Sequence, residues 1–411
     1  MTIVEFYDKA SIENIVGALL CQPAKVVFVC DKHKELERAI NLYRGILDRN
    51  NVASELAYRT VNRNNLQEII DTLAAIVEEH DDCVFDLTGG EDLYLVAVGA
   101  IMERYKGRVQ CHRFNLKSDM LNDCDADGNV CSSRSFDISI RDNIAIYGGQ
   151  IVTDEKCEIY TYPWDFNEEF LRDIDAMWDI CRNNTRLWNA QIGTLGAVCE
   201  AFANEDPMHL CFDKKQASPV LREMGIKLVC APWILNELNK HGLISSLVMG
   251  DTVSLVFKNE QVKRCLTVSG QILELAVASK MIGLRDKEGL PLYHDVRVGV
   301  VIDWDRPEAA DLYRTVNEID VMAMRGSIPV FISCKNGFFD VNELYKLNTV
   351  AGRFGHKYAK KVLVSTELDK LGQRGEYIRA RMEDMKIRSV ENVDAISSSE
   401  FERILRSLWS N

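Results

Sequence analysis

The sequence predicts an α/β protein built from more than one domain. Its 411 residues exceed what one hydrophobic core usually holds, so two or three domains are expected. In the first third, short apolar runs typical of strands alternate with amphipathic segments typical of helices, which indicates a parallel, doubly wound sheet. Near the other end, one helix precedes a group of strands, which predicts a second sheet of different construction.

Composition describes an ordinary folded protein with an acidic surface. Hydrophobic residues make up 47% and charged residues 27% of the chain, and the formal net charge is -13. This charge argues against a permanently exposed, strongly basic nucleic-acid surface, although a local basic region remains compatible with it. Between residues 340 and 388, 11 Lys or Arg residues outnumber 7 Asp or Glu residues, so the acidity lies elsewhere.

Cysteine spacing and the N-terminal residues bear on the cellular compartment. The 13 cysteines form no CxxC pair and no cluster at zinc-like spacing. Cys30, Cys199 and Cys265 stand in apolar surroundings, as small core residues do in a reducing cytosol. The N-terminus lacks the pattern of a signal peptide, and no stretch of about 20 apolar residues occurs. We therefore expect a cytoplasmic protein that does not contact membranes.

The first domain is expected over residues 1–150. Its predicted strands cover 2–6, 25–30, 53–58, 83–87 and 108–114, and its predicted helices 11–20, 34–48, 65–79 and 91–105. Ser11 suits the N-cap of the first helix. The polar stretch that follows predicts a hairpin loop at 125–129 and then two short strands over 136–140 and 143–147.

Parallel sheets bind ligands at the carboxyl ends of their strands, so the loops there are candidate binding sites. The best candidate is the loop after strand 83–87, with the sequence Asp86-Leu87-Thr88-Gly89-Gly90-Glu91-Asp92. Its glycines allow close backbone approach, Thr88 offers a hydroxyl, and the free amides that open the next helix attract phosphate. A tight strand-to-helix turn without a ligand is the alternative. Neither a dinucleotide fingerprint nor a P-loop motif occurs, which disfavours nicotinamide enzymes and P-loop NTPases.

The middle of the chain, residues 151–268, has a different pattern of predicted helices and strands. Helices are predicted over 168–183, 192–203 and 232–240, followed by strands 243–249 and 252–258 joined at Gly250-Asp251. Helices followed by a two-stranded wing predict a winged-helix-like module. Helix 232–240 carries Glu237 beside Lys240 and lacks the basic face of a DNA-reading helix. We interpret the module as a spacer or a dimer element.

The last domain, residues 269–411, carries the candidate catalytic residues. A helix over 271–281 and a strand over 296–304 are expected to precede a hairpin that turns at 325–327, followed by helix 341–359, strand 361–365 and helix 374–385. Glu318 and Asp320 lie two apart on one strand of the hairpin and so share a face, and Lys335 lies on its neighbour. Carboxylates and an amine at strand ends suit a divalent metal and the hydrolysis of a phosphodiester. A hairpin with solvated charges is the alternative.

Glu274 is a further candidate because it stands almost alone among the apolar residues of helix 271–281. A charge on a buried helix needs a partner or a metal ion. The alternative is a glutamate whose carboxylate reaches solvent at the helix start.

Two parts of the sequence resemble known families. The order helix, three strands, helix, strand, helix, together with Glu274, Asp320 and Lys335, resembles the restriction-endonuclease-like PD-(D/E)xK nuclease core. The first domain, with Asp86-Leu87-Thr88-Gly89-Gly90 after a buried strand, resembles the Rossmann-like CARF domain, the sensor of cyclic oligoadenylates in type III CRISPR systems. In this order, and over most of the chain, they resemble the CARF-nuclease effectors of those systems.

This resemblance implies a homodimer in which paired CARF domains bind one cyclic oligoadenylate, the tetra-adenylate above all, and rearrange the nuclease domains. It implies ligand contacts from Thr88, Gly89, Gly90 and Glu91, with Asp8, Lys9, Ala10 and Ser11 beside them. It also implies cleavage of single-stranded DNA or RNA and nicking of duplex DNA with manganese or magnesium.

The sequence departs from the nuclease motif at Ser333, where an acid is expected two residues before the lysine. Because a hydroxyl is a weaker metal ligand than a carboxylate, either another acid supplies the missing ligand or the enzyme is weak. We expect Asp320 to be the central metal ligand, with support from Glu274, Glu318 and the Cys334 carbonyl. Lys335 would orient the attacking water or stabilise charge on the phosphorane.

Two other functions remain open at this point. One is a ligand-responsive DNA-binding regulator that uses the winged-helix-like middle and has an inactive nuclease fold. The other is a ring nuclease that degrades its own activator in the sensor domain.

Overall fold

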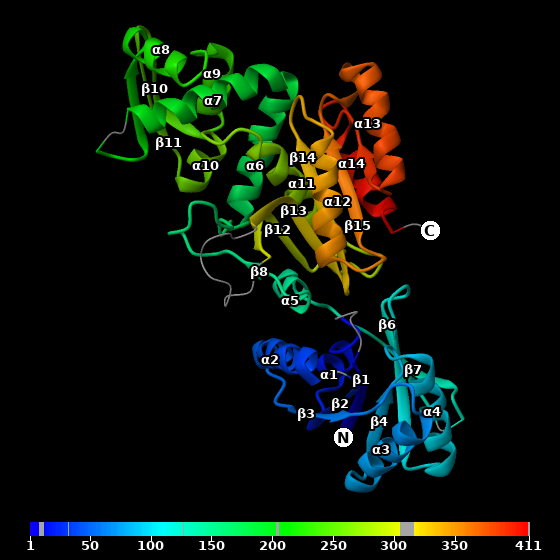
Figure 1. Cartoon of the computed structure of the whole chain (residues 1–411). Coiled ribbons are helices and arrows are strands. Elements are labelled where there is room, and N and C mark those ends of the chain that lie inside the picture. The colour runs from blue at the N-terminus through cyan, green and yellow to red at the C-terminus, as the bar shows by residue number, and fades with distance from the viewer. Residues whose placement is uncertain (8–11, 32, 126, 203–204, 305–315, 410–411) are drawn as a thin grey trace.

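The computed structural model divides into a first domain and two further parts that pack against each other (Figure 1). In Figure 1 the first domain, blue to cyan, lies at one end of the molecule, and the short helix α5 (Ile140–Ile146) lies between it and the rest. No helix in the described part of the chain has the length and apolar character needed to cross a membrane. The structure describes residues 1–7, 12–31, 33–125, 127–202, 205–304 and 316–409.

The first domain contains a 7-stranded sheet in the order β3-β2-β1-β4-β5-β6-β7, as far as the chain is described. Strands β1 to β5 are parallel, in the order of a doubly wound sheet, as predicted. The strands are β1 (Thr2–Phe6), β2 (Lys25–Cys30), β3 (Glu55–Thr60), β4 (Cys83–Asp86), β5 (Val109–Asn115), β6 (Met120–Cys124) and β7 (Val130–Ser135). The helices are α1 (Val16–Cys21), α2 (His33–Arg49), α3 (Leu66–Glu79) and α4 (Asp92–Arg104).

Two local predictions after β5 have opposite outcomes. The hairpin loop at 125–129 is confirmed between β6 and β7, where the Asp125 carboxylate accepts hydrogen bonds from the amides of Asp127 and Asn129 at 3.0 and 2.8 Å. The strands predicted over 136–140 and 143–147 are wrong, because α5 occupies this segment. Ser139 caps α5 by accepting from the Asp142 amide at 3.0 Å, and this cap outweighs the strand propensity of the isoleucines.

The middle part combines helices with a 3-stranded antiparallel sheet in the order β10-β11-β9. β10 and β11 pair where the two-stranded wing was predicted, but β9 joins them as a third strand. β9, α8 and α10 were not predicted. Helix α8 contains Pro219, which in the sequence reads as a helix breaker. The elements are α6 (Glu168–Asn183), α7 (Thr185–Ala201), β9 (His209–Asp213), α8 (Lys214–Glu223), α9 (Pro232–Lys240), β10 (Ile244–Met249), β11 (Thr252–Phe257) and α10 (Glu260–Cys265).

The last part contains a mixed 6-stranded sheet in the order β16-β15-β14-β13-β12-β8, again among described residues. β12, β13 and β14 are antiparallel, whereas β14, β15 and β16 are parallel. The predicted order of helix, three strands, helix, strand and helix is present, and β16 and α14 were not predicted. The elements are β8 (Gln150–Ile151), α11 (Gln271–Gly283), β12 (Asp295–Asp303), β13 (Val316–Arg325), β14 (Ile328–Lys335), α12 (Asn342–Phe354), β15 (Lys360–Ser365), a 3-10 turn (Leu368–Leu371), α13 (Gln373–Asp384), β16 (Arg388–Val390) and α14 (Ser398–Ser407).

Helices cover both faces of this mixed sheet. On one face, α11 packs with α6 and α14 in an apolar core that includes Leu273, Val277 and Val321. On the other face, α12 and α13 pack with strand residues such as Phe331 and Leu363. Since β12, β14 and β15 end at the edge where β13 begins, this edge collects the strand termini, and the candidate catalytic residues lie there.

Candidate functional site

The hairpin of β13 and β14 places Asp320 beside the end of β14. Its register pairs Val321 with Ile332, so the residues before Val321 lie next to those after Ile332. The Asp320 carboxylate accepts three hydrogen bonds, all on Oδ2: from the Cys334 amide at 2.6 Å, the Ser333 hydroxyl at 3.2 Å and the Lys335 ammonium at 3.3 Å. Asp320 is therefore held in one orientation by the residues that end β14.

Ser333, which stands where the nuclease motif has an acid, serves as a hydrogen-bond donor to Asp320. The amide of its neighbour Cys334 donates to the same carboxylate. The Cys334 carbonyl, and not this amide, is the group that we expected to bind the metal. Both residues are 7% exposed. They thus position Asp320 from inside the sheet.

Lys335 has a second partner that the sequence did not predict. Its ammonium lies 3.0 Å from Oε2 of Glu343, in the first turn of α12, and 3.3 Å from Asp320. Burial opposes the charge of Lys335, but the negative charges of Asp320 and Glu343 outweigh burial and raise its pKa above the ordinary value. Lys335 is therefore charged at neutral pH. In the sequence, Glu343 looks like any acid that opens a helix.

Glu274 and Glu318 approach Asp320 from α11 and β13. Burial and the nearby charges of Asp320 and Glu318 raise the pKa of Glu274 well above its usual range. Although Glu318 is exposed, partial desolvation and the charge of Asp320 likewise raise the pKa of its carboxyl group. Gln271, one turn before Glu274, donates to its Oε2 at 2.8 Å. The acids predicted from the sequence therefore lie within electrostatic reach of one another, with Lys335 beside them.

A glycine in the neighbouring strand leaves room for these acids. Gly299 of β12 has φ of +60°, which L side chains rarely adopt, and a Cβ there would lie 3.2 Å from Oε1 of Glu318. The run Val298-Gly299-Val300 is otherwise a buried apolar strand. The glycine therefore marks the place where β12 passes close to the carboxylate cluster, and a lone glycine in an apolar strand is the sequence signal for such a close approach.

The chemistry of this cluster fits a divalent cation. Glu274, Glu318 and Asp320 supply carboxylate oxygens, the ligands that Mg²⁺ and Mn²⁺ prefer, and a cation would relieve the repulsion that raises the pKa of Glu274. In the described residues, however, no three His, Cys, Asp or Glu side chains already stand close enough together to hold a metal ion. The carboxylates would therefore have to close around the ion as it binds.

The loop after β4, predicted to bind a ligand, is fixed by its own hydrogen bonds. Oδ1 of Asp86 accepts from the Thr88 amide at 2.7 Å, and Oγ1 of Thr88 accepts from the Phe114 amide at 2.7 Å. The Thr88 hydroxyl oxygen therefore accepts a hydrogen bond within the fold, and no residue in the described part of the chain accepts one from its proton. Gly90 has φ of +98°, and a Cβ there would lie 2.9 Å from that of Phe6, so this position requires glycine.

The other predicted ligand contacts lie partly in this loop and partly outside the described residues. Glu91 forms an ion pair with Arg63 at 2.7 Å, and Arg63 also approaches Asp31 at 3.3 Å. Glu91 is therefore already paired with a cation at the rim of the loop. Gly89 lies between Thr88 and Gly90 in the same loop. The predicted contacts Asp8, Lys9, Ala10 and Ser11 lie outside the described residues.

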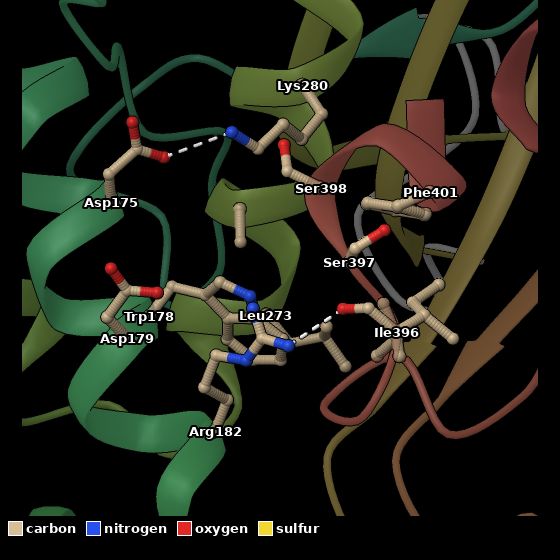
Figure 2. Close-up of a pocket in the computed structure, with 12 residues that line it drawn as sticks. Asp175, Trp178, Asp179, Arg182, Leu273, Lys280, Ile396, Ser397, Ser398 and Phe401 are labelled. Carbon is tan, nitrogen blue, oxygen red and sulfur yellow. Dashed lines mark hydrogen bonds and ion pairs between the residues drawn. The ribbon is translucent and has the colours of Figure 1, made fainter. Parts of the chain in front are cut away.

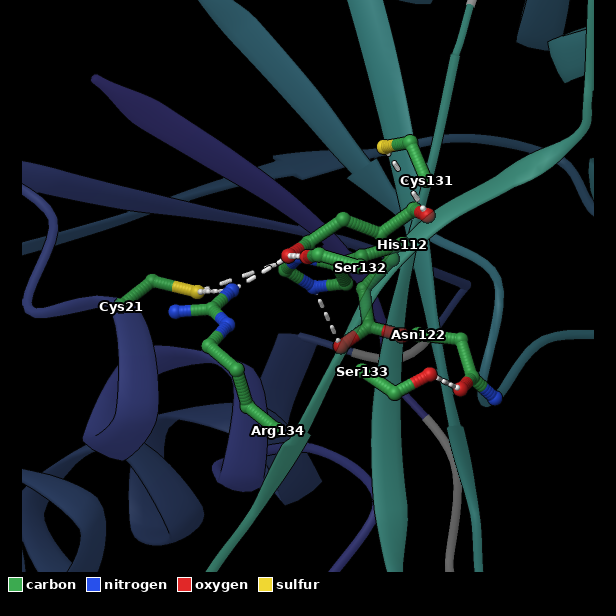
Figure 3. Close-up of polar contacts among 9 residues, drawn as sticks. Cys21, His112, Asn122, Cys131, Ser132, Ser133 and Arg134 are labelled. Atoms are coloured by element: carbon green, nitrogen blue, oxygen red, sulfur yellow. Dashed lines mark hydrogen bonds and ion pairs between the residues drawn. The ribbon is translucent and has the colours of Figure 1, made fainter.

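A buried polar network that the sequence did not predict supports this loop. Oδ2 of Asp86 lies 2.9 Å from Nε2 of His112, which is 1% exposed. Burial opposes the charge of His112, but its hydrogen bonds to Asp86 and Cys21 raise the pKa of His112 to about 10. Figure 3 shows Arg134 directed toward Cys21, at 3.2 Å, with His112 beside them. A lone histidine in a strand carries no sequence signal for such a network.

Comparisons with known proteins identify the fold. No protein-family model and no curated protein sequence matches the chain. Among solved structures, protein VC1899 from Vibrio cholerae aligns with a TM-score of 0.72 and 17% identity over 99% of this chain and 97% of that one. Can2 from Sulfobacillus thermosulfidooxidans, in complex with cyclic tetra-adenylate, aligns with a TM-score of 0.65 and 15% identity over 100% of this chain and 99% of that one. The chain has the fold of Can2 and VC1899. This full-length match confirms the resemblance predicted from the sequence.

Within this Can2-like fold, a hollow of about 220 Å³ between α6, α11 and α14 lies apart from the carboxylate cluster (Figure 2). Leu273 of α11 lines the hollow, but neighbouring Glu274 does not. Figure 2 shows Arg182 reaching across to the backbone oxygen of Ile396, at 2.7 Å, and Lys280 reaching Asp175, at 3.4 Å. These contacts join the middle part to the last one, so we assign the hollow a structural role.

Proposed function

We propose that this chain is a metal-dependent endonuclease activated by a cyclic oligoadenylate in type III CRISPR defence. One observation carries the proposal: a chain with the fold of Can2, whose structure contains cyclic tetra-adenylate, also has Glu318, Asp320 and Lys335 at one sheet edge, with Glu274 of α11 within electrostatic reach of them. The proposed substrates are single-stranded DNA or RNA, with nicking of duplex DNA. Cyclic tetra-adenylate is the proposed activator, and a homodimer is the proposed assembly.

Each residue of the cluster has its own proposed catalytic role. Asp320 would hold Mn²⁺ or Mg²⁺, with Glu274, Glu318 and the Cys334 carbonyl in support, and the bound ion would polarise the phosphate and acidify a water molecule. Lys335, charged and held between Asp320 and Glu343, would orient that water and stabilise negative charge on the phosphate. The Ser333 hydroxyl and the Cys334 amide keep Asp320 in place.

The sensor role is assigned to the loop after β4. Thr88 can donate its hydroxyl proton to a ligand, while Gly89 and Gly90 allow a phosphate to approach the backbone at the start of α4. Glu91 and the segment Asp8 to Ser11 complete the proposed contacts. Binding would rearrange the nuclease domains of the dimer so that nucleic acid can enter.

One assay tests the proposal. Labelled single-stranded DNA, single-stranded RNA and supercoiled plasmid are incubated with the purified protein and Mn²⁺ or Mg²⁺, with and without each cyclic oligoadenylate. We expect cleavage only with metal and activator, and loss of cleavage without loss of activator binding in Asp320→Asn. Asp251→Asn is the matched control, because the Asp251 side chain is 82% exposed in a distant turn.

Three outcomes would redirect the assignment. If none of the substrates is cleaved in an activator-dependent way, the proposal is contradicted. Degradation of the activator without added metal favours a ring nuclease. Salt-sensitive binding of duplex DNA without cleavage, unchanged in Lys335→Ala, favours a regulator. For that last function, the Glu237 carboxylate lies 3.1 Å from the Lys240 ammonium and so reduces the positive charge of α9.

A further inference from the structure

An exposed aromatic residue follows the candidate catalytic lysine closely in the sequence. Phe338 follows Lys335 by three residues and is 66% exposed, whereas its neighbour Phe339 is 4% exposed. The guanidinium carbon of Arg374 lies 4.5 Å from the centre of the Phe338 ring, within the range of a cation–π interaction. Arg374 is also paired with Asp340 at 2.6 Å. A large apolar side chain is therefore held by its neighbours in a position that faces solvent.

Helix α13 repeats this pairing of an aromatic ring with an arginine. Arg374, Tyr377 and Arg381 are spaced by three and four residues, so they share one face of the helix. Tyr377 is 48% exposed, and the guanidinium carbon of Arg381 lies 5.4 Å from the centre of its ring. Phe338, Arg374, Tyr377 and Arg381 thus form a row of alternating rings and cations, which we call the stacking surface.

The stacking surface begins at the edge of the sheet that carries the candidate catalytic residues. Lys335 pairs with Ser365 at the ends of β14 and β15, and the Thr366 amide donates to the Lys335 carbonyl at 3.2 Å. The chain reaches the start of α13 from that point after one short 3-10 turn. A strand of nucleic acid that places a phosphate at Lys335 would therefore meet Phe338 first and α13 next.

The chemistry of the surface selects its partner. Bases in single strands expose their faces for stacking on aromatic rings, whereas bases in a duplex are already stacked on each other. The arginines beside the rings are paired with the carboxylates of Asp340 and Asp384, at 2.6 and 2.9 Å, and the phosphates that link those bases would take the place of these carboxylates. All of the surface except Phe338 also lies within the segment from 340 to 388, where 11 Lys or Arg residues outnumber 7 Asp or Glu residues in an otherwise acidic chain. A buried core role is excluded by the exposure of Phe338 and Tyr377.

We propose that Phe338, Arg374, Tyr377 and Arg381 bind single-stranded nucleic acid by stacking its bases and pairing with its phosphates, and so guide it to Lys335. This inference rests on the proposed nuclease function and adds a selection for single strands over duplexes. Phe338 contributes the stacking position nearest to the scissile phosphate.

Binding measured without cleavage tests the inference. Fluorescence anisotropy is followed with the full-length protein in EDTA, with and without cyclic tetra-adenylate, using labelled 20-nucleotide oligothymidine, oligouridine, an abasic strand and a duplex. We expect Phe338→Ala to weaken binding of the base-containing single strands roughly 5- to 150-fold, the equivalent of about 1 to 3 kcal/mol per stacked base. Its binding of the abasic strand and of the duplex should change little.

Two further variants separate stacking from other effects. Phe338→Tyr keeps a ring and should retain most of the affinity, while Trp233→Ala removes another aromatic side chain, 42% exposed on the distant helix α9, and should bind as the parent does. The inference is overturned if the parent binds none of the single strands, binds the abasic strand as well as oligothymidine, or binds equally well after Phe338→Ala. Selective binding without cleavage in Mn²⁺ or Mg²⁺ contradicts the nuclease proposal and leaves the stacking surface supported.

Discussion

The Asp119 carboxylate accepts hydrogen bonds from the Ser327 amide at 3.0 and 3.1 Å, and so joins the first domain to the mixed sheet of the last part. Asp119 lies in the turn between β5 and β6, and Ser327 in the turn between β13 and β14. The other end of the same hairpin carries Asp320 and Lys335. A rigid pair of strands therefore connects the first domain to the carboxylate cluster.

Gly326 makes this contact possible. It has φ of +59°, and a Cβ at this position would overlap the Asp119 carboxylate. Its carbonyl accepts from the Ile138 amide at 3.1 Å, which adds a second link to the segment before α5. The hairpin turn is thus shaped to fit against the first domain.

We predict that Asp119→Ala uncouples the activator from cleavage. Without the carboxylate, movement of the first domain is transmitted less well to the hairpin, so stimulation by cyclic tetra-adenylate should fall roughly 5-fold or more, within the usual range of allosteric coupling. Cleavage rates with and without activator, together with activator binding, provide the measurement. Asp127→Ala, in the turn between β6 and β7, is the control and should respond like the parent. Full stimulation in Asp119→Ala would show that the signal takes another route.

A second prediction concerns Glu274, whose charge is unfavourable without a metal ion. Burial and the charges of Asp320 and Glu318 oppose its ionisation, and glutamine can still accept the hydrogen bond from Gln271. In Glu274→Gln we expect cleavage to fall at least about 100-fold, while the melting temperature in EDTA stays the same or rises. Single-turnover cleavage and thermal melting measure both, with Glu223→Gln on α8 as control. A large drop in melting temperature would indicate that Glu274 is chiefly structural.

The third prediction is that Glu343 acts through Lys335. Glu343→Gln leaves Lys335 with Asp320 as its charged partner, so cleavage should fall about 10- to 100-fold, as is typical of residues that orient a catalytic group. Lys335→Ala should cost about 100- to 1,000-fold. Because both changes affect one interaction, the double variant should be no worse than Lys335→Ala. Additive losses would mean that Glu343 has a separate role, and the cleavage rates of the three variants decide.

The sequence predicted what depends on local pattern. The apolar run Lys25–Cys30 and the hairpin around Gly326 lie where they were expected, because burial of one or both strand faces imposes a readable period. Helix α5 was missed because a single N-cap at Ser139 decided its structure against the preference of its isoleucines. Local propensity is a weak guide wherever one capping bond or one packing contact settles the outcome.

In the candidate site, too, the contacts that follow from local pattern could be predicted from the sequence, and the others could not. Glu318, Asp320 and Lys335 could be placed together because strand period and hairpin pairing fix their relation. The Glu343 contact with Lys335 could not, because it depends on how α12 packs after β14. The pairing of Asp86 with His112 depends on the register of β4 and β5, which are separated by helix α4, and this register leaves no local trace in the sequence. Such contacts follow from tertiary structure alone.

The fourth prediction uses that buried pair and concerns stability. The pKa of His112 is raised from 6.5 to about 10, so the stabilisation from its proton is complete below pH 6.5 and is lost as the pH rises toward 10. Unfolding measured across this range should show stability falling with pH, by up to about 1.4 kcal/mol per pH unit more than in His112→Gln, whose side chain does not titrate. The groups that face His112 are Glu5, Cys21, Asp86, Asp123 and Arg134.

His241→Gln provides the control for this experiment, because the His241 side chain is 43% exposed on the surface beyond α9. Its stability should fall with pH as steeply as that of the parent. Parallel curves for the parent and His112→Gln would mean that His112 is neutral in the folded protein at neutral pH. Divergence of the two curves between pH 6.5 and 10 would show that a charged pair holds the Thr88 loop in place, since Asp86 binds both His112 and the Thr88 amide.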